Sequence, residues 1–449
     1  MNIDMTQGPA MKSMLRFAVP MILGNLLQQC YNITDTLIVG KYLGSNALAA
    51  VGSSFTLMTF LTSILLGLCM GSGTLFSIRF GEKDEKGLKE SICCSFLLIF
   101  FFTVILNVLA FIFLNQIQPF LNVPEEVWNE MRSYLSVIFC GIFAVFLYNY
   151  FASLLRAIGN AVVPLIFLAI SAIINIALDL WLIIGLHQGV AGAAAATVIA
   201  QYISGIGIAI YYGFHPISRY FAGIKKYGYR ISWHCMREIA SFSLLTCVQQ
   251  SIMNLGILLV QGVVNSFGPS VMAAFAAGVK IDAFAYMPVQ DFGNAFSTFI
   301  AQNYGAKKQE RIRTGLRGAV LVALLFCAIV SATVWIFARP LMLLFVNAEE
   351  TSIITEGIRY LHIEGAFYCG IGCLFLLYGL YRALGKPEMS VVLTVVSLGT
   401  RVALAYFLSA IPEIGVVGIW WAVPIGWFLA DSIGFIYYIA TPQKPAPKN

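Results

Sequence analysis

The sequence has very little charge. Only 11% of its 449 residues are Asp, Glu, Lys or Arg, against about 25% in ordinary soluble domains. It also has only four histidines, and its ten cysteines show no paired CxxC spacing. We therefore expect neither a resident metal or other cofactor nor a disulfide framework. No His, Ser or Cys constellation indicates nucleophile, base or metal chemistry, so we expect no enzyme and no catalytic residues.

What the sequence does have is apolar residues, 59% of the chain, in long runs. About 20 helical residues cross the hydrocarbon layer of a bilayer. The runs predict an all-α membrane protein with twelve transmembrane helices. Their predicted ranges are 14–40, 46–78, 88–115, 126–156, 161–186, 189–213, 233–266, 270–303, 314–346, 350–383, 388–410 and 414–440.

The basic residues indicate how the chain is oriented. Of the 27 Lys and Arg residues, 21 fall at the N-terminal side or in every second connection. Cytoplasmic loops carry such an excess, so we expect both termini in the cytoplasm of a multi-pass plasma-membrane protein. The same residues are scattered between apolar runs instead of forming one patch, which argues against nucleic acid as a partner.

The chain also repeats itself. LGSNALAAV (43–51) aligns with FGPSVMAAF (267–275) at a shift of 224, and LLRAIGN (154–160) with LYRALGK (380–386) at a shift of 226. Six spans per repeat give both halves the same orientation, as in many secondary transporters. We predict two pseudo-symmetric six-helix lobes, 1–213 and 233–449, joined by a cytoplasmic linker, 214–232.

The first half carries a polar set that the second half lacks. The set consists of Asp35, Asn175, Asp179 and Thr197. At the repeat offsets, these residues correspond in that order to Leu259, Arg401, Ala405 and Val423. All four are placed in the outer half of the first bundle, and Tyr134 is expected at a similar depth.

Two carboxylates with nearby amide, hydroxyl and backbone oxygens suit a small hard cation such as Na⁺. They also suit a proton, because two like charges held close favour protonation of one of them. The alternative is a set of unrelated polar residues, each hydrogen-bonded near its own helix. A carboxylate within lipid is costly, and for the two aspartates we favour the shared site.

The second half has intramembrane charges of its own. The candidates for cavity charges are Lys280, Asp291, Glu364, Arg401 and Asp431. Three of them, Glu364, Arg401 and Asp431, are placed near mid-depth, where the two acids would neutralise the charge of the arginine. Lys280 and Asp291 lie three helical turns apart on one predicted span, and pairing and substrate contact both stay open for them.

Several motifs together resemble the multidrug and toxic-compound extrusion (MATE) family. They are the D-x-x-x-V-G and A-L-A-A-V-G segments within 20–52 and the Q-N-x-G-A element at 302–306. The resemblance covers essentially the whole chain and is closer to the DinF-like branch. The NorM-like branch has an acid in the seventh span, where this sequence offers the amides Gln249, Gln250, Asn254 and Gln261.

The resemblance implies roles for several residues. It places Asp35, Asn175, Asp179 and Thr197 in a cation site of the N-terminal lobe, with the backbone carbonyl of Ala193 as a further ligand. Gln28, Tyr134 and Asn149 match the surrounding hydrogen-bond network, and Pro20 matches a proline at which the first helix bends.

The expected function is a secondary antiporter that exports cationic or amphipathic drugs and toxic compounds in exchange for Na⁺ or H⁺. Its lobes would alternate access around a V-shaped cavity. We expect a monomer whose partners are membrane lipid and small substrates. The alternative is a flippase for a lipid-linked precursor, which Lys280 and Arg401 keep open. A channel for polar solutes fits the unequal repeats less well.

Overall fold

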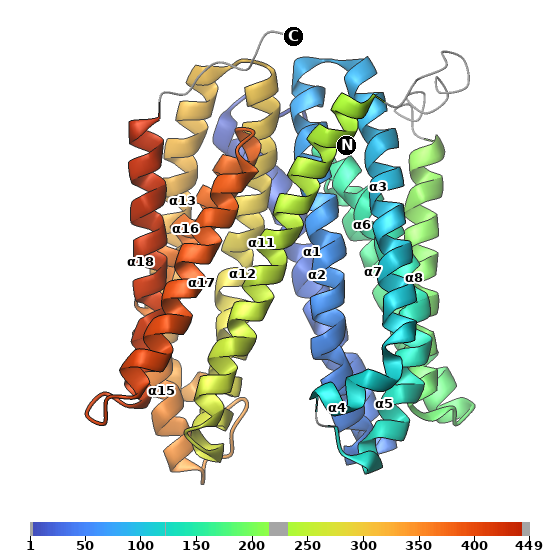
Figure 1. Cartoon of the computed structure of the whole chain (residues 1–449), viewed down its shortest axis with the longest axis vertical. Helices are drawn as coiled ribbons and strands as arrows, with labels where there is room; N and C mark the ends of the chain where they lie inside the picture. The colour runs from blue at the N-terminus through green and yellow to red at the C-terminus, as the bar shows by residue number, and fades with distance from the viewer. Residues whose placement is uncertain (1–2, 122, 215–231, 442–449) are drawn as a thin grey trace. The chain divides into compact units, whose positions relative to one another are not determined.

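The computed structural model describes residues 3–121, 123–214 and 232–441. Helices make up nearly all of this part of the chain, and it contains no strand (Figure 1). The all-α prediction is therefore confirmed. Backbone polar groups in lipid must be paired within their own segment, which explains why so apolar a chain is helical. The predicted linker 214–232 lies, except for Phe214 and Ser232, outside the described residues.

All six predicted spans of the first half are helical. The helices are α1 (Ala10–Leu43), α2 (Ser45–Glu82), α3 (Glu85–Ile112), η1 (Leu114–Gln116), α4 (Ile117–Leu121), α5 (Glu125–Ile138), η2 (Phe139–Gly141), α6 (Ile142–Ala157), α7 (Val162–Asp179), the π-helix η3 (Leu180–Gly185) and α8 (Gly189–Phe214). The fourth predicted span thus comprises α5, η2 and α6.

The six predicted spans of the second half are helical as well. These helices are α11 (Trp233–Asn265), α12 (Pro269–Gly305), α13 (Gln309–Ile336), α14 (Ala338–Met342), α15 (Thr351–Gly365), α16 (Tyr368–Ala383), α17 (Pro387–Ser409) and α18 (Val416–Ala440). The helices α1 and α12 continue through Pro20 and Pro288.

Ten helical segments of the described chain are long and apolar enough to cross a membrane. The helices α15 and α16 meet at a bend of 51° and together make an eleventh. The twelfth predicted span is α1, which has 34 residues and is long enough to cross a membrane but is not apolar enough to be counted with the others. Its polar stripe, including Gln28, Asn32 and Asp35, lowers its hydropathy.

The chain forms two compact units. Unit 1 consists of Met1–Ile3 and Val19–Cys247, and unit 2 of Asp4–Ala18 and Val248–Asn449. Of the three boundaries between the units, one lies between Ile3 and Asp4, and the other two fall inside helices, one within α1 and one within α11. Each unit therefore includes the first part of a helix that continues in the other.

Each unit has its own aromatic core. In unit 1, α6 packs on α2 and α8, and Tyr150 meets Phe76 edge to face with ring centroids 6.3 Å apart. In unit 2, α12 packs on α15 and α16, and Phe275 stacks on Trp420 at 5.6 Å. Large apolar side chains elsewhere stay exposed, such as Ile173 at 70%, as expected for a surface that faces lipid.

Candidate functional site

The carboxyl groups of Asp35 and Asp179 meet inside unit 1. Asp35 lies about two turns before the end of α1, and Asp179 is the last residue of α7. Their side chains lie within hydrogen-bonding range of each other. Asp179 is fully buried and Asp35 is half-buried. The helix changes to the π-helix η3 directly after Asp179, and such turns are frequent at functional sites.

The oxygen atoms of this pair have few hydrogen-bond donors. Asp35 Oδ1 and both carboxylate oxygens of Asp179 are buried and accept no hydrogen bond from the described residues. Two carboxylates can share a hydrogen bond only when one of them carries a proton. A buried acceptor without a donor is costly, so these atoms are suited to a proton or a cation.

Asn175 and Thr197 add neutral oxygens beside the carboxyl pair. Asn175 lies one turn before Asp179 on α7, is buried, and donates from Nδ2 to Thr197 Oγ1 on α8 at 3.3 Å. Its Oδ1 atom is buried and accepts no hydrogen bond from the described residues. Ala193 is buried one turn before Thr197. The structure therefore brings Asp35, Asp179, Asn175 and Thr197 into one region of unit 1.

Two tyrosines lie near the pair. Tyr134 on α5 is buried and close enough to interact electrostatically with both carboxyl groups. Tyr31, which the sequence reasoning missed, lies near Asp35 and is hydrogen-bonded to Gln28. Gln28 itself is exposed and is linked to the pair through Tyr31, which interacts electrostatically with Asp35. The helical spacing of four between Tyr31 and Asp35 could have indicated this neighbour.

Asn149 and Pro20 are placed differently from these residues. Asn149 donates from Nδ2 to the carbonyl oxygen of Val145 in its own helix, α6, at 2.9 Å. Pro20 is half-buried in α1, just after the boundary between Ala18, which belongs to unit 2, and Val19, which belongs to unit 1. A proline inside a helix removes one backbone hydrogen bond and marks a place where the helix can bend.

Unit 2 contains a second carboxyl pair, Asp282 on α12 and Glu364 on α15. The Tyr360 hydroxyl donates to Asp282 Oδ2 at 2.5 Å, and its oxygen also lies 2.9 Å from Glu364 Oε2. Tyr368 donates to the other oxygen of Asp282. Arg401 on α17 interacts electrostatically with both acids. Sequence reasoning placed Glu364 and Arg401 together but did not pair Glu364 with Asp282 or find the tyrosines.

The other predicted cavity charges of unit 2 are Asp431, Asp291 and Lys280. Asp431 is buried near Cys373 and Tyr378. Asp291 is buried, whereas Lys280 is exposed and lies 5.9 Å from the centroid of the Phe345 ring. The two ends of the predicted Lys280–Asp291 stripe therefore have different surroundings.

The donor sets also indicate which ion each region could hold. Among the described residues, no three or more His, Cys, Asp or Glu side chains gather as a metal site. The pair in unit 1 offers two carboxylates and two neutral side-chain oxygens. Such a set fits a proton or a weakly held Na⁺ better than a tightly bound transition metal, which prefers nitrogen or sulfur ligands.

Repeated apolar helices that bury charges in each half are typical of a membrane transporter. The sequence pattern of the MatE family matches residues 20–181 and 246–407. The chain therefore belongs to the MatE family of transporters, as the resemblance predicted. Both ends of the second match lie 226 residues after those of the first, which confirms the internal repeat.

Relatives and solved structures agree with this family. The chain is 28% identical to the probable multidrug resistance protein YpnP of Bacillus subtilis (strain 168), over 97% of this chain and 96% of the relative. It is 25% identical to DNA damage-inducible protein F of Escherichia coli (strain K12), over 93% and 89%. A MATE transporter solved in an outward-facing conformation matches with a TM-score of 0.88 and 24% identity, over 97% and 96% of the two chains.

Proposed function

We propose that this transporter is a secondary antiporter that exports cationic or amphipathic compounds in exchange for inward Na⁺ or H⁺. The observation that carries the proposal is the Asp35–Asp179 pair, whose buried oxygens lack donors and lie beside Asn175 and Thr197. The names of the relatives, several of them multidrug resistance or export proteins, support the substrate class.

The pair is the ion-coupling site of this proposal. Na⁺ would be held by Asp35, Asp179, Asn175 and Thr197, with the carbonyl of Ala193 as a further ligand. A bound cation or proton supplies the positive charge that makes two adjacent carboxylates tolerable in an apolar bundle. The chain's own part is to hold the two carboxyl groups together and to keep other donors away from them.

Coupling follows from a difference in ion affinity between two conformations. An ion shifts the equilibrium toward the conformation that binds it more tightly. Asp35 and Pro20 share α1, so a change at the carboxyl pair can be accommodated by bending of that helix at the proline. Ion binding from outside thus favours release of the exported compound to the outside, and the emptied carrier reorients.

The remaining expectations complete this proposal. The lobes are 1–213 and 233–449, joined by the cytoplasmic linker 214–232, and both termini lie in the cytoplasm. The carrier works as a monomer in the plasma membrane, surrounded by lipid. The excess of basic residues on one side supports this orientation.

A lipid-linked precursor flippase fits these residues less well. Such a substrate carries phosphate and needs free cationic side chains. Arg401, one of the two basic residues that favour this alternative, lies beside the acids Asp282 and Glu364. The two neighbouring carboxyl groups offset its charge, so it is a weak phosphate ligand.

Efflux of a fluorescent cation from cells or proteoliposomes tests the proposal, with the sodium and pH gradients varied independently. Efflux that follows one gradient identifies the coupling ion. Efflux that follows neither gradient, while the purified protein moves a phosphate-bearing lipid, would favour the flippase and overturn the antiporter proposal.

A further inference from the structure

The first helix of each repeat begins in the unit that holds the other repeat. The segment Asp4–Ala18, which includes the start of α1, belongs to unit 2. The segment 233–247, the start of α11, belongs to unit 1. We call these two stretches the exchanged segments. Neither is explained by the ion site, and each is attached by specific polar contacts.

The exchanged segment of α11 packs closely on α2. A Cβ atom at Gly67 would lie 2.5 Å from Cα of Cys247, and one at Gly71 would collide with the backbone of Phe242. Small residues allow such close approach of helices in lipid. Next to the second of these contacts, the buried hydroxyl groups of Ser72 and Ser243 are 2.7 Å apart and share a hydrogen bond.

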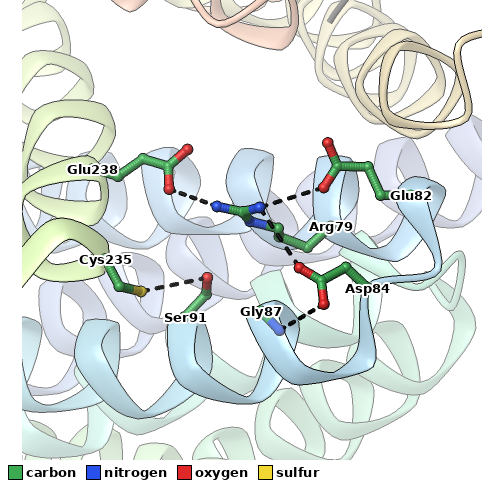
Figure 2. A network of polar contacts seen from close by, with 7 residues as sticks. All are labelled: Arg79, Glu82, Asp84, Gly87, Ser91, Cys235 and Glu238. Atoms are coloured by element: carbon green, nitrogen blue, oxygen red, sulfur yellow. Dashed lines mark hydrogen bonds and ion pairs between the residues drawn. The ribbon is translucent and has the colours of Figure 1, made fainter. Parts of the chain in front are cut away.

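An ion-pair network attaches the N-terminal part of the same segment to α2 (Figure 2). Arg79 Nη2 on α2 donates to Glu238 Oε2 on α11 at 2.7 Å, and Arg79 Nη1 lies 3.5 Å from Glu82 and 3.6 Å from Asp84. The side chains of Arg79 and Glu238 are 14% and 29% exposed. An ion pair with this access to water can separate more readily than a fully buried one.

The exchanged segment of α1 is attached by its leading residues 4–8, the N-terminal strap. Met5 is fully buried, donates its backbone N–H to Gln302 Oε1 at 3.1 Å, and accepts from Asn303 Nδ2 at 3.1 Å. The guanidinium group of Arg311 donates to the carbonyl oxygens of Met5, Gln7 and Gly8.

The two attachments occupy corresponding places in the repeats. Arg79 and Asn303 correspond at the shift of 224, and both lie near the end of the second helix of their repeat. Arg79 binds Glu238 near the start of α11, and Asn303 binds Met5 in the strap that precedes α1. The ends of α2 and α12 are both predicted on the cytoplasmic side, where the basic residues gather.

We propose that the exchanged segments are two cytoplasmic latches, which undock together when the carrier opens to the cytoplasm and dock again when it closes. The proposal rests on the alternating access assigned above. It extends that mechanism by naming contacts distant from the carboxyl pair that must break in each cycle.

A disulfide across the α11 latch tests the proposal. Ser72→Cys with Ser243→Cys places two thiols where hydroxyl groups now touch, in a background with Cys69→Ala and Cys247→Ala. Copper phenanthroline removes two electrons and two protons to form the S–S bond, which mass spectrometry verifies. We expect transport to fall at least tenfold on oxidation and to return with reductant, while each single cysteine variant is unaffected by the oxidant. Cross-linked protein that transports at the reduced rate would overturn the latch.

A second readout needs no transport and therefore separates the latch from the antiporter proposal. Cys235 is 6% exposed in the docked α11 segment. With Cys93→Ser and Cys94→Ser, an impermeant maleimide applied to inside-out vesicles should label Cys235 only on undocking. We expect Glu238→Gln to raise the labelling rate at least threefold and the cross-link to suppress it. Arg237→Gln, at an exposed neighbour outside the network of Figure 2, is the matched control.

The strap provides the test of joint release. Arg311→Gln removes donors to three strap carbonyls, whereas Arg313→Gln changes a residue whose side chain is 65% exposed. If the latches release together, Arg311→Gln should raise labelling of Cys235 in the other unit about twofold and Arg313→Gln should not. Hydrogen exchange shows whether Arg311→Gln loosens the strap. If the strap is loosened but labelling of Cys235 does not change, joint release is overturned.

Discussion

In unit 1 the carboxyl groups of Asp35 and Asp179 face each other with three oxygens that accept no hydrogen bond from the described residues. In unit 2, both oxygens of Asp282 accept hydrogen bonds from the hydroxyl groups of Tyr360 and Tyr368. The two repeats thus each bury a carboxyl pair, but among the described residues the pair in unit 2 leaves a single buried oxygen, Glu364 Oε1, without a donor.

The difference separates an exchangeable site from a structural one. A carboxylate with hydroxyl donors is stabilised by groups that stay with the protein, and a nearby arginine offsets its charge. A pair without such donors depends on something that comes from solution. We therefore expect ion exchange in unit 1, and in unit 2 a contribution chiefly to stability.

The largest expected effect follows from removing one charge of the unit 1 pair. Asp179→Asn keeps the shape of the side chain but cannot alternate between charged and neutral forms. We expect transport to fall to background, at least about 100-fold, the size expected when a buried charged interaction of about 3 kcal/mol is lost. The measurement is gradient-driven efflux in proteoliposomes, and Asp35→Asn should behave alike.

Asp282→Asn is the control for this prediction. It should reduce the amount of folded protein in the membrane more than the transport per folded molecule. Insertion of Asp179→Asn should match that of the unchanged protein. Full drug export by Asp179→Asn, or loss of transport only in Asp282→Asn, would reverse the roles assigned to the two units.

A smaller effect is expected from the tyrosines of unit 2. Tyr368→Phe removes a buried hydrogen bond to a carboxylate, which contributes about 1.5–3 kcal/mol when one partner is charged. We expect a lower midpoint of thermal unfolding in detergent, with the dependence of transport on ion concentration unchanged. Tyr134→Phe in unit 1 is the counterpart and should shift the ion dependence more than the midpoint. The same thermal loss from both variants would remove the contrast.

A still smaller effect is expected from the neutral ligands. Thr197→Val keeps the volume of the side chain and removes the hydroxyl that accepts from Asn175 at 3.3 Å. We expect the ion concentration for half-maximal transport to rise about tenfold, equivalent to about 1.4 kcal/mol. Asn149→Ala, at a side chain bonded within its own helix, should leave that concentration within about twofold. Equal shifts in the two variants would contradict the assigned ligand set.

The periodic features of this protein could be predicted from its sequence. Apolar runs predict the helices because lipid leaves few other ways to pair the backbone. Asn175 and Asp179 are four residues apart, so their common helix face follows from spacing alone. Comparison of the repeats then separates Asp35 and Asp179, which have apolar counterparts, from the shared scaffold.

Contacts between distant segments could not be predicted in this way. Tyr360 and Asp282 are 78 residues apart, and no periodicity relates them. The attachment of α11 through Ser72 and Ser243 joins residues 171 apart and depends on how closely two helices pack. The internal repeat indicates which segments have similar sequences. It does not indicate which of the two units contains the first part of α1 and which contains the first part of α11.

The smallest expected effect concerns Asp4. This carboxylate lies outside the membrane-spanning segments and accepts hydrogen bonds from neighbouring residues of the strap. Burial raises the pKa of Asp4, but hydrogen bonds from Thr6 and Gln7 and the positive charge of Lys308 outweigh burial, so the pKa lies below its ordinary value. The Thr6 N–H and hydroxyl donate at 2.8 and 2.7 Å. Because the folded pKa is lowered, the carboxylate stabilises the strap fully above about pH 4, and this contribution is lost as the pH falls through the folded pKa.

Hydrogen exchange of the strap, corrected for intrinsic rates, measures this contribution. We expect protection of the Thr6 N–H to be constant from pH 6 down to about pH 4 and to fall below that, by no more than about fivefold for so exposed a group. Asp4→Asn should lower protection at all these pH values and remove the pH dependence. Protection that instead increased on acidification would mean that the donors do not dominate at Asp4. The same reasoning would then lose its force for Asp282, whose tyrosine donors distinguish unit 2 from the carboxyl pair of unit 1.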